Sequence, residues 1–201
     1  MDGKKKKSID DEVFYEKENC KIEKETYRSI KDILNYTIPA WLENGGLSIQ
    51  DPVLRIRLSG DGRNVGRKIK HVMVTFTLLN NLLNHYEPDY HYTLILYPGI
   101  ESYESLKLAT KLLIKDLNDI KTGFIDYQGR KWNVELYFSA DWKFMAMCLG
   151  HKAANCDAFC LWCNCKKNTI GYINPENGDW CISKNIEKIA NNYATTPGYN
   201  N

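Results

Sequence analysis

Two aspartates, Asp61 and Asp141, stand at positions from which a carboxylate can reach a ligand. Each is expected just past the end of a β-strand, and the carboxyl ends of neighbouring parallel strands meet at one edge of a sheet. Two carboxylates brought together repel each other unless a cation lies between them. Mg²⁺, or Mn²⁺ in its place, binds such oxygens together with phosphate oxygens, so the pair predicts a divalent-metal site that acts on phosphodiesters.

Each aspartate also has an ordinary structural explanation. Asp61 forms an Asp-Gly pair with Gly62, which is a common turn sequence. Asp141 precedes a segment with helical spacing, where an aspartate often caps the helix. Gly60, Gly62 and Gly66 could also belong to a phosphate-binding loop, but a strand rather than a helix is expected after them, and no Walker lysine follows.

The cysteines form a second concentration of reactive side chains, since six of the seven lie between positions 148 and 181, both included. Cys160 and Cys163 make a CxxC pair, which supplies half of a tetrahedral zinc site because the short loop directs both thiolates at one ion. The remaining ligands could come from His151, Cys156, Cys165 or Cys181, or from beyond residue 201. A redox-active pair and buried cysteines without a metal are the alternatives.

Basic residues gather close to the first aspartate. The formal net charge is only +2, so overall charge does not by itself predict nucleic-acid binding. Arg63, Arg67 and Lys68 follow Asp61 within a glycine-containing segment, where they can contact nucleic-acid phosphates. The lysine run at residues 4–7 is either a solvated tail or a segment for nuclear targeting or phosphate contact.

The chain shows no sign of membrane insertion or secretion. It has no run of about 18 apolar residues, and its charged start lacks the apolar centre of a signal peptide. We therefore expect an intracellular protein with no membrane partner, nuclear if the lysine run is a targeting signal. In that setting the cysteines are expected to be thiols or metal ligands rather than disulfides.

The elements that position these residues are expected in the order strand, strand, strand, helix, strand, helix. The strands are predicted at 54–58, 72–79, 92–97 and 132–138, and the helices at about 102–118 and 141–150. The first three strands have connections too short for a crossover helix, so they should be antiparallel. The helix after the third strand allows the fourth to lie parallel to the first. This layout predicts an α/β fold with an RNase H-like mixed sheet.

Three regions follow from this reading. Residues 1–50 are expected to form a basic tail and a helical segment, with Pro39 interrupting the helix and Gly45-Gly46 ending it. Residues 51–150 correspond to a partial RNase H-like core. Residues 151–201 correspond to a Cys-rich zinc-binding segment that is incomplete in its ligands.

Three short motifs resemble the catalytic core of the V(D)J recombination-activating recombinase and the Transib-type transposases. They are residues 58–62, residues 138–141 and the CxxC at 160–163, and the resemblance spans roughly residues 53–165. In that family the first catalytic aspartate lies in a similar Asp-Gly setting, and the second follows a strand shortly before a zinc CxxC. Cys160 lies 19 positions after Asp141. The chain also resembles transposon-derived open reading frames that are expanded in some fungal genomes.

The resemblance implies a DDE-type core in which Asp61 and Asp141 bind Mg²⁺, Cys160 and Cys163 bind structural Zn²⁺, and DNA is cleaved and transferred. The family's third carboxylate and its paired zinc histidines have no counterpart here, so we expect a truncated core. The alternative is a non-catalytic zinc-binding module that contacts protein or nucleic acid. RNA in place of DNA, and assembly as a homodimer, are further alternatives.

Overall fold

The computed structural model describes residues 26–65, 69–80, 86–152 and 155–169, together with the single residues 185 and 187. Two of the predicted nucleic-acid contacts, Arg67 and Lys68, lie outside the described residues. The lysine run at 4–7 and Cys181 also lie outside them. The predictions made for those positions stay predictions.

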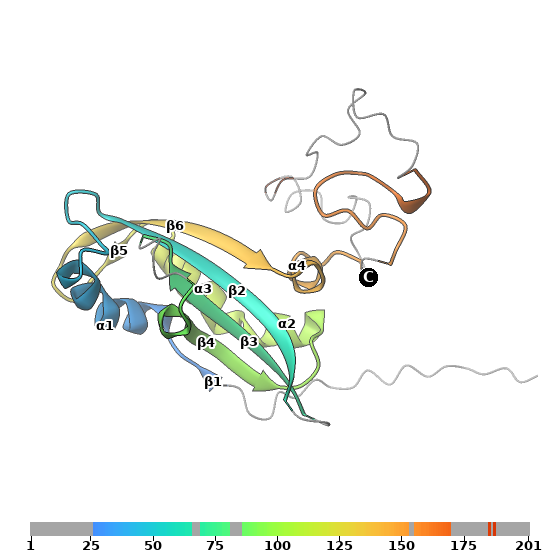
Figure 1. Cartoon of the computed structure of the whole chain (residues 1–201), viewed down its shortest axis with the longest axis horizontal. Helices are drawn as coiled ribbons and strands as arrows, with labels where there is room; N and C mark the ends of the chain where they lie inside the picture. The colour runs from blue at the N-terminus through green and yellow to red at the C-terminus, as the bar shows by residue number, and fades with distance from the viewer. Residues whose placement is uncertain are drawn as a thin grey trace, which may run out of the picture.

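In its described part the protein is α/β, with a curved six-stranded sheet and four helices (Figure 1). The strands are β1 (Thr26–Tyr27), β2 (Val53–Val65), β3 (Ile69–Leu78), β4 (Tyr92–Pro98), β5 (Phe124–Ile125) and β6 (Lys131–Ala140). They lie in the order β1-β4-β3-β2-β6-β5. The expected antiparallel pairing of β2 with β3 and of β3 with β4 is confirmed, as is the parallel pairing of β2 with β6.

The helices are α1 (Ile30–Glu43), α2 (Tyr103–Ala109), α3 (Lys111–Ile120) and α4 (Trp142–Cys148), with short 3₁₀ turns at Pro88–Tyr90 and Lys167–Thr169. The single helix predicted at 102–118 is therefore two helices that meet at Thr110. The hydroxyl of Thr110 donates to the carbonyl of Leu106 at 2.7 Å. A threonine that bonds back to the preceding turn favours a bend, which accounts for the break.

Helix α1 shows where turn-forming residues do and do not decide the structure. The prediction that Pro39 interrupts this helix was wrong, because α1 continues past it to Glu43. Ile38 and Trp41 are both buried and hold the last turn of α1 in the core. The helix does end before Gly45, as predicted, and Gly45 adopts a φ of 72°, which glycine accommodates without strain.

Strand β2 is longer than its composition suggests. Its first half alternates as predicted, with Leu54, Ile56 and Leu58 buried on one face. The prediction that this strand ends at residue 58, before a turn at Asp61-Gly62, was wrong, because β2 runs on to Val65 and stays paired with β3 along that length. The ladder of hydrogen bonds to a strand-forming partner outweighs the turn preference of Ser, Gly and Asp.

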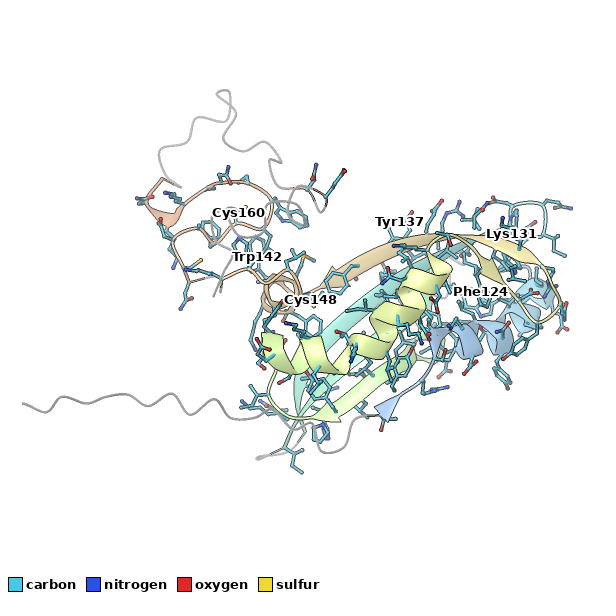
Figure 2. All side chains as sticks on the ribbon, turned by 180° about the vertical axis from the view of Figure 1, so that it is seen from behind. Phe124, Lys131, Tyr137, Trp142, Cys148 and Cys160 are labelled. Carbon is cyan, nitrogen blue, oxygen red and sulfur yellow. The ribbon has the colours of Figure 1, made fainter. Side chains whose placement is uncertain are left out.

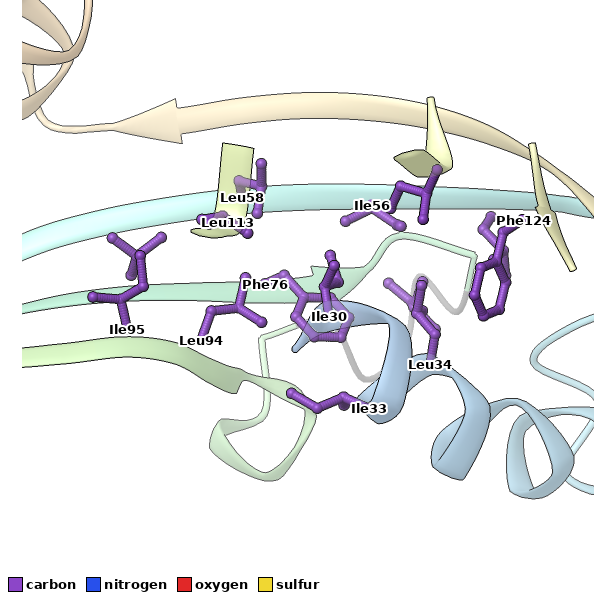
Figure 3. Packing of buried hydrophobic residues seen from close by; sticks show 14 of the residues in the cluster. Ile30, Ile33, Leu34, Ile56, Leu58, Phe76, Leu94, Ile95, Leu113 and Phe124 are labelled. Atoms are coloured by element: carbon purple, nitrogen blue, oxygen red, sulfur yellow. The ribbon is translucent and has the colours of Figure 1, made fainter. Parts of the chain in front are cut away.

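The core lies on the face of the sheet that bears the even-numbered residues of β2. Figure 3 shows Ile56 and Leu58 of β2 together with Phe76 of β3 and residues of α1 and α3. Buried side chains from these elements form one hydrophobic cluster: Ile30, Leu34, Leu54, Ile56, Phe76, Leu94, Leu113, Phe124 and Trp132 are among its members. Because side chains alternate along a strand, the odd-numbered residues of β2, including Asp61, point to the opposite face.

Candidate functional site

The two predicted catalytic aspartates follow paired positions on neighbouring parallel strands. Gly60 of β2 is in register with Ala140 of β6, and this is the last residue pair between these two strands. Asp61 and Asp141 come immediately after them. One step earlier, the hydroxyls of Ser59 and Ser139 lie 3.2 Å apart and share a hydrogen bond, so both side chains point to the same face. The backbone thus places the two aspartates at the point where the pairing of β2 with β6 ends.

The structural explanation offered for Asp141 is confirmed. Its side chain caps α4, and the Oδ1 atom accepts the backbone N–H of Phe144 at 2.7 Å. This bond fixes the orientation of the carboxylate and leaves Oδ2 without a partner among the described residues. The side chain is exposed at the surface. Asp141 therefore combines a structural bond with an oxygen that is available to a ligand.

Asp61 does not occupy a turn, so the turn explanation for its Asp-Gly pair was wrong. It lies inside β2, in register with Met73 of β3. Its side chain is exposed and has no hydrogen-bond or ion-pair partner within the described ranges. A rigid strand therefore presents a carboxylate with both oxygens unused.

A further carboxylate, which sequence reasoning missed, lies beside Gly62 of β2. Glu101 follows β4, and its carboxyl carbon would be only 2.9 Å from a methyl group placed on Gly62. It forms an ion pair with Lys143 of α4, two positions after Asp141. No sequence pattern singles out Glu101, because only the fold brings the end of β4 beside β2.

These carboxylates do not form a complete metal cage. Across the described ranges, no group of three or more His, Cys, Asp or Glu side chains is arranged to hold a metal ion. What the structure supplies is two exposed aspartates, one inside β2 and one that caps α4 directly after β6, to which a cation could bind with the remaining ligands provided by water or phosphate oxygens.

The predicted zinc ligands lie in the segment that follows α4. Figure 2 shows Cys160 there, beyond Trp142 of α4, and the Trp142 and Phe159 rings pack with centroids 6.5 Å apart. The Sγ atoms of Cys160 and Cys163 are 3.4 Å apart. The backbone N–H of Trp162 points at Cys160 Sγ, also at 3.4 Å. The two thiols therefore face each other, as a shared metal would require.

The surroundings of Cys163 disfavour a free thiolate. Burial raises its pKa, and the nearby sulfurs of Cys160 and Cys165 raise it further, while a backbone hydrogen bond from Cys165 opposes the shift. A bound cation reverses this preference, since a coordinating thiol loses its proton. None of the five cysteines within the described ranges is in a disulfide, as expected.

Comparison with known proteins assigns no relative. No protein family matches this chain, and no curated protein matches it. None of the described helices is long and apolar enough to cross a membrane.

Proposed function

We propose that this chain carries an RNase H-like core of the DDE transposase and recombinase type, which cleaves DNA phosphodiesters and transfers strands with Mg²⁺ or Mn²⁺ bound at Asp61 and Asp141. The single observation that carries the proposal is the parallel register of Gly60 with Ala140, directly before the two aspartates. Three antiparallel strands, a helical crossover and a parallel strand are the order that this fold requires.

The two aspartates suit a hard divalent cation. Both are exposed and carry oxygens without partners among the described residues, and Mg²⁺ is commonly held by one or two carboxylates plus phosphate oxygens. Such a metal supplies Lewis-acid stabilisation of the charge that develops on a phosphodiester. The protein's own contribution is to fix the two carboxylates on a strand and on a helix cap.

We assign Zn²⁺ to Cys160 and Cys163, with a structural role. The facing sulfurs and the N–H of Trp162 directed at Cys160 support this assignment. The other ligands, and the family's third carboxylate, would have to come from elsewhere. Placed after α4, the zinc would stabilise the segment that adjoins Asp141.

The alternative is a non-catalytic zinc-binding module that contacts protein or nucleic acid. The observation that favours it is the contrast between the two sites. The Sγ atoms of Cys160 and Cys163 already face each other, and a structural zinc needs no third carboxylate; within the described ranges, neither the cysteine pair nor the aspartate pair belongs to a group of three or more possible metal ligands. Nuclear localisation and assembly as a homodimer are compatible with both proposals.

The test is Mn²⁺ binding, followed by the electron paramagnetic resonance signal of the free ion. We expect the parent to bind Mn²⁺ and the double variant Asp61→Asn with Asp141→Asn to lose that binding. The matched control is Glu87→Gln with Asp89→Asn, which removes the same charge from exposed residues elsewhere. Equal binding by the parent and the site variant would refute the metal assignment.

Two further readouts separate the alternatives. Cleavage of supercoiled plasmid in Mn²⁺ that depends on both aspartates supports a nuclease, whereas Mn²⁺ binding without cleavage supports the binding module. Zinc content, measured by mass spectrometry, should fall in Cys160→Ser with Cys163→Ser. It should be unchanged in Cys148→Ser, which alters a cysteine on α4.

A further inference from the structure

Strand β6 forms an outer edge of the sheet along most of its length (Figure 1). Strand β5 covers only the start of β6, where it pairs with Lys131 and Trp132. On the opposite side, β6 is paired with β2 from Asn133 to Ala140. Among the described residues, β6 therefore has a strand partner on one side only from Asn133 onward.

The backbone hydrogen bonds show which groups of β6 lie at this edge. The N–H of Asn133 donates to the carbonyl of Pro52 at 2.8 Å, on the side of β2. The carbonyl of Arg130, directly before β6, accepts the N–H of Asp126 at 3.0 Å, on the side of β5. Because this direction alternates along a strand, the N–H and C=O groups of the even-numbered residues from 134 to 140 point outward. Within the described part of the chain these groups have no partner.

This edge lacks the features by which sheets usually avoid pairing with another chain. Residues 133–140 contain no proline and no lysine, and Glu135 is their one charged residue. Their register with β2 is continuous, so the strand has no bulge. Leu136, Tyr137 and Phe138 have exposed fractions of 39%, 44% and 41%. A long, regular and apolar edge of this kind is a template for a further strand.

The even-numbered side chains of the edge lie on the core face of the sheet. Phe138 is in register with the buried Leu58 of β2. It lines an apolar cavity of about 270 Å³ together with Ile114 of α3 and Phe144 of α4. A strand added to β6 would bring its own apolar side chains next to Phe138 and would extend the apolar face that α3 and β6 leave exposed.

We propose that this added strand is the β6 of a second copy of the chain, which pairs antiparallel with the first about a two-fold axis at Tyr137. A two-fold axis allows one surface to pair with its own copy. A centre at Tyr137 joins residues 134–140 of the two copies. This range begins after the part that β5 covers and ends before α4, so the length of the free edge selects the centre.

The core face of the two strands is self-complementary in this register. Leu136 lies opposite Phe138 of the second copy, and Val134 lies opposite Ala140 of the second copy. All four side chains are apolar, and apolar cross-strand pairs stabilise a sheet. Since the even-numbered residues carry the outward N–H and C=O groups, each of these pairs also exchanges two hydrogen bonds.

The other face is compatible with the same register. Glu135 lies opposite Ser139 of the second copy, and the two Tyr137 rings meet at the axis. A centre at Glu135 would instead oppose two carboxylates, which is destabilising. Arg63, the predicted nucleic-acid contact, lies beyond the part of β2 that pairs with β6 and is in register with His71 of β3. The interface contains none of the candidate metal ligands, so it is independent of the proposed function.

The test measures the mass of the full chain by sedimentation equilibrium over a range of protein concentrations, where we expect a monomer–dimer equilibrium. Tyr137→Glu and Tyr137→Lys each place like charges across the axis. Each should therefore raise the dissociation constant of the dimer about tenfold. An equimolar mixture of the two variants should restore dimerisation, because a glutamate then faces a lysine. The matched controls, Tyr127→Glu and Tyr127→Lys, change an exposed tyrosine between β5 and β6 and should behave like the parent.

Amide hydrogen exchange checks that the outward N–H groups form the pairing. The amides of Leu136 and Phe138 should be better protected at high than at low protein concentration. A parent that stays monomeric, or a dimer that neither Tyr137 substitution weakens, would overturn the proposal. Protection of these amides in the monomer would also overturn it, since another part of the chain would then cover the edge. Circular dichroism verifies that all variants are folded.

Discussion

Two ends of the β5–β6 region use aspartate in opposite ways. Asp126, between β5 and β6, is buried, with 3% of its side chain exposed. Its Oδ1 accepts the backbone N–H groups of Gln128 and Arg130, each at 2.9 Å. Its Oδ2 accepts Arg130 Nε at 2.7 Å and Trp132 Nε1 at 3.0 Å. Asp141, at the far end of β6, is exposed, and among the described residues its side chain accepts one hydrogen bond, from the backbone N–H of Phe144.

The comparison shows how the surroundings decide the role of a carboxylate. Burial opposes the ionisation of Asp126, but the hydrogen bonds from Trp132 and Arg130 outweigh it and hold the pKa below the usual range. Asp126 is satisfied by the protein and stabilises the β5–β6 turn. Asp61 and Asp141 have carboxylate oxygens without a hydrogen-bond partner among the described residues, so these oxygens can bind a ligand.

The largest expected effect on stability is at Asp126. Asp126→Ala should lower the free energy of unfolding by about 3 kcal/mol, because Arg130 and Trp132 lose their partner in a buried site. Urea unfolding measures this loss. The exposed Asp89→Ala should stay within about 0.5 kcal/mol of the parent. Similar urea midpoints for Asp126→Ala and Asp89→Ala would contradict the proposed difference between the buried aspartate and the exposed ones.

The contribution of Asp126 to the free energy of unfolding should also depend on pH. Because the pKa of Asp126 is lowered by folding, its stabilisation is complete above the unfolded value of about 3.9 and is lost as the pH falls through the lower folded value. The Asp126→Asn variant has no ionisable group at this position, so it lacks this pH-dependent stabilisation. The stability gap between the parent and Asp126→Asn should therefore narrow as the pH falls below about 4, and a constant gap would contradict the account.

A smaller loss is expected at Gly60, between the core and the candidate site. A methyl group there would lie 2.1 Å from the ring of Phe144, which is buried. Gly60→Ala should cost about 2 kcal/mol through overpacking and should weaken Mn²⁺ binding, because α4 carries both Phe144 and the cap Asp141. Adding Phe144→Leu should recover part of the stability. The neighbouring Ser59→Ala serves as control, and equal stability of Gly60→Ala and this control would contradict the packing argument.

The smallest effects are expected at the candidate site itself. Asp141→Ala should cost about 1 kcal/mol through loss of the helix cap, whereas Asp141→Asn should cost little because asparagine caps equally well. Asp61→Asn should change stability by less than about 0.5 kcal/mol, since the exposed side chain has no partner among the described residues. Thermal and urea unfolding check all three variants. A larger loss for Asp61→Asn than for Asp141→Ala would mark Asp61 as a structural residue.

Periodicity predicted much of the sheet. The alternation of Leu54, Ile56 and Leu58 predicts a half-buried strand, and the short connections predict antiparallel neighbours; both are confirmed. The errors fall where local composition competes with long-range pairing. Ser59 to Gly62 has the composition of a turn, but pairing with β3 keeps it in β2. Pro39 predicts a break in the helix, but α1 continues past it because its last turn is packed in the core.

The sequence by itself determined the four longer strands and their pairing, the alternation along the first half of β2, the cap at Asp141 and the CxxC spacing of Cys160 and Cys163. These follow from local preferences and from spacing along the chain. Only the tertiary structure decided that Asp61 lies within a strand, and that Glu101 and Lys143 meet beside Gly62. The physical reason is that such contacts join segments distant in sequence, and no local pattern encodes a partner that only the packed sheet and helices bring near.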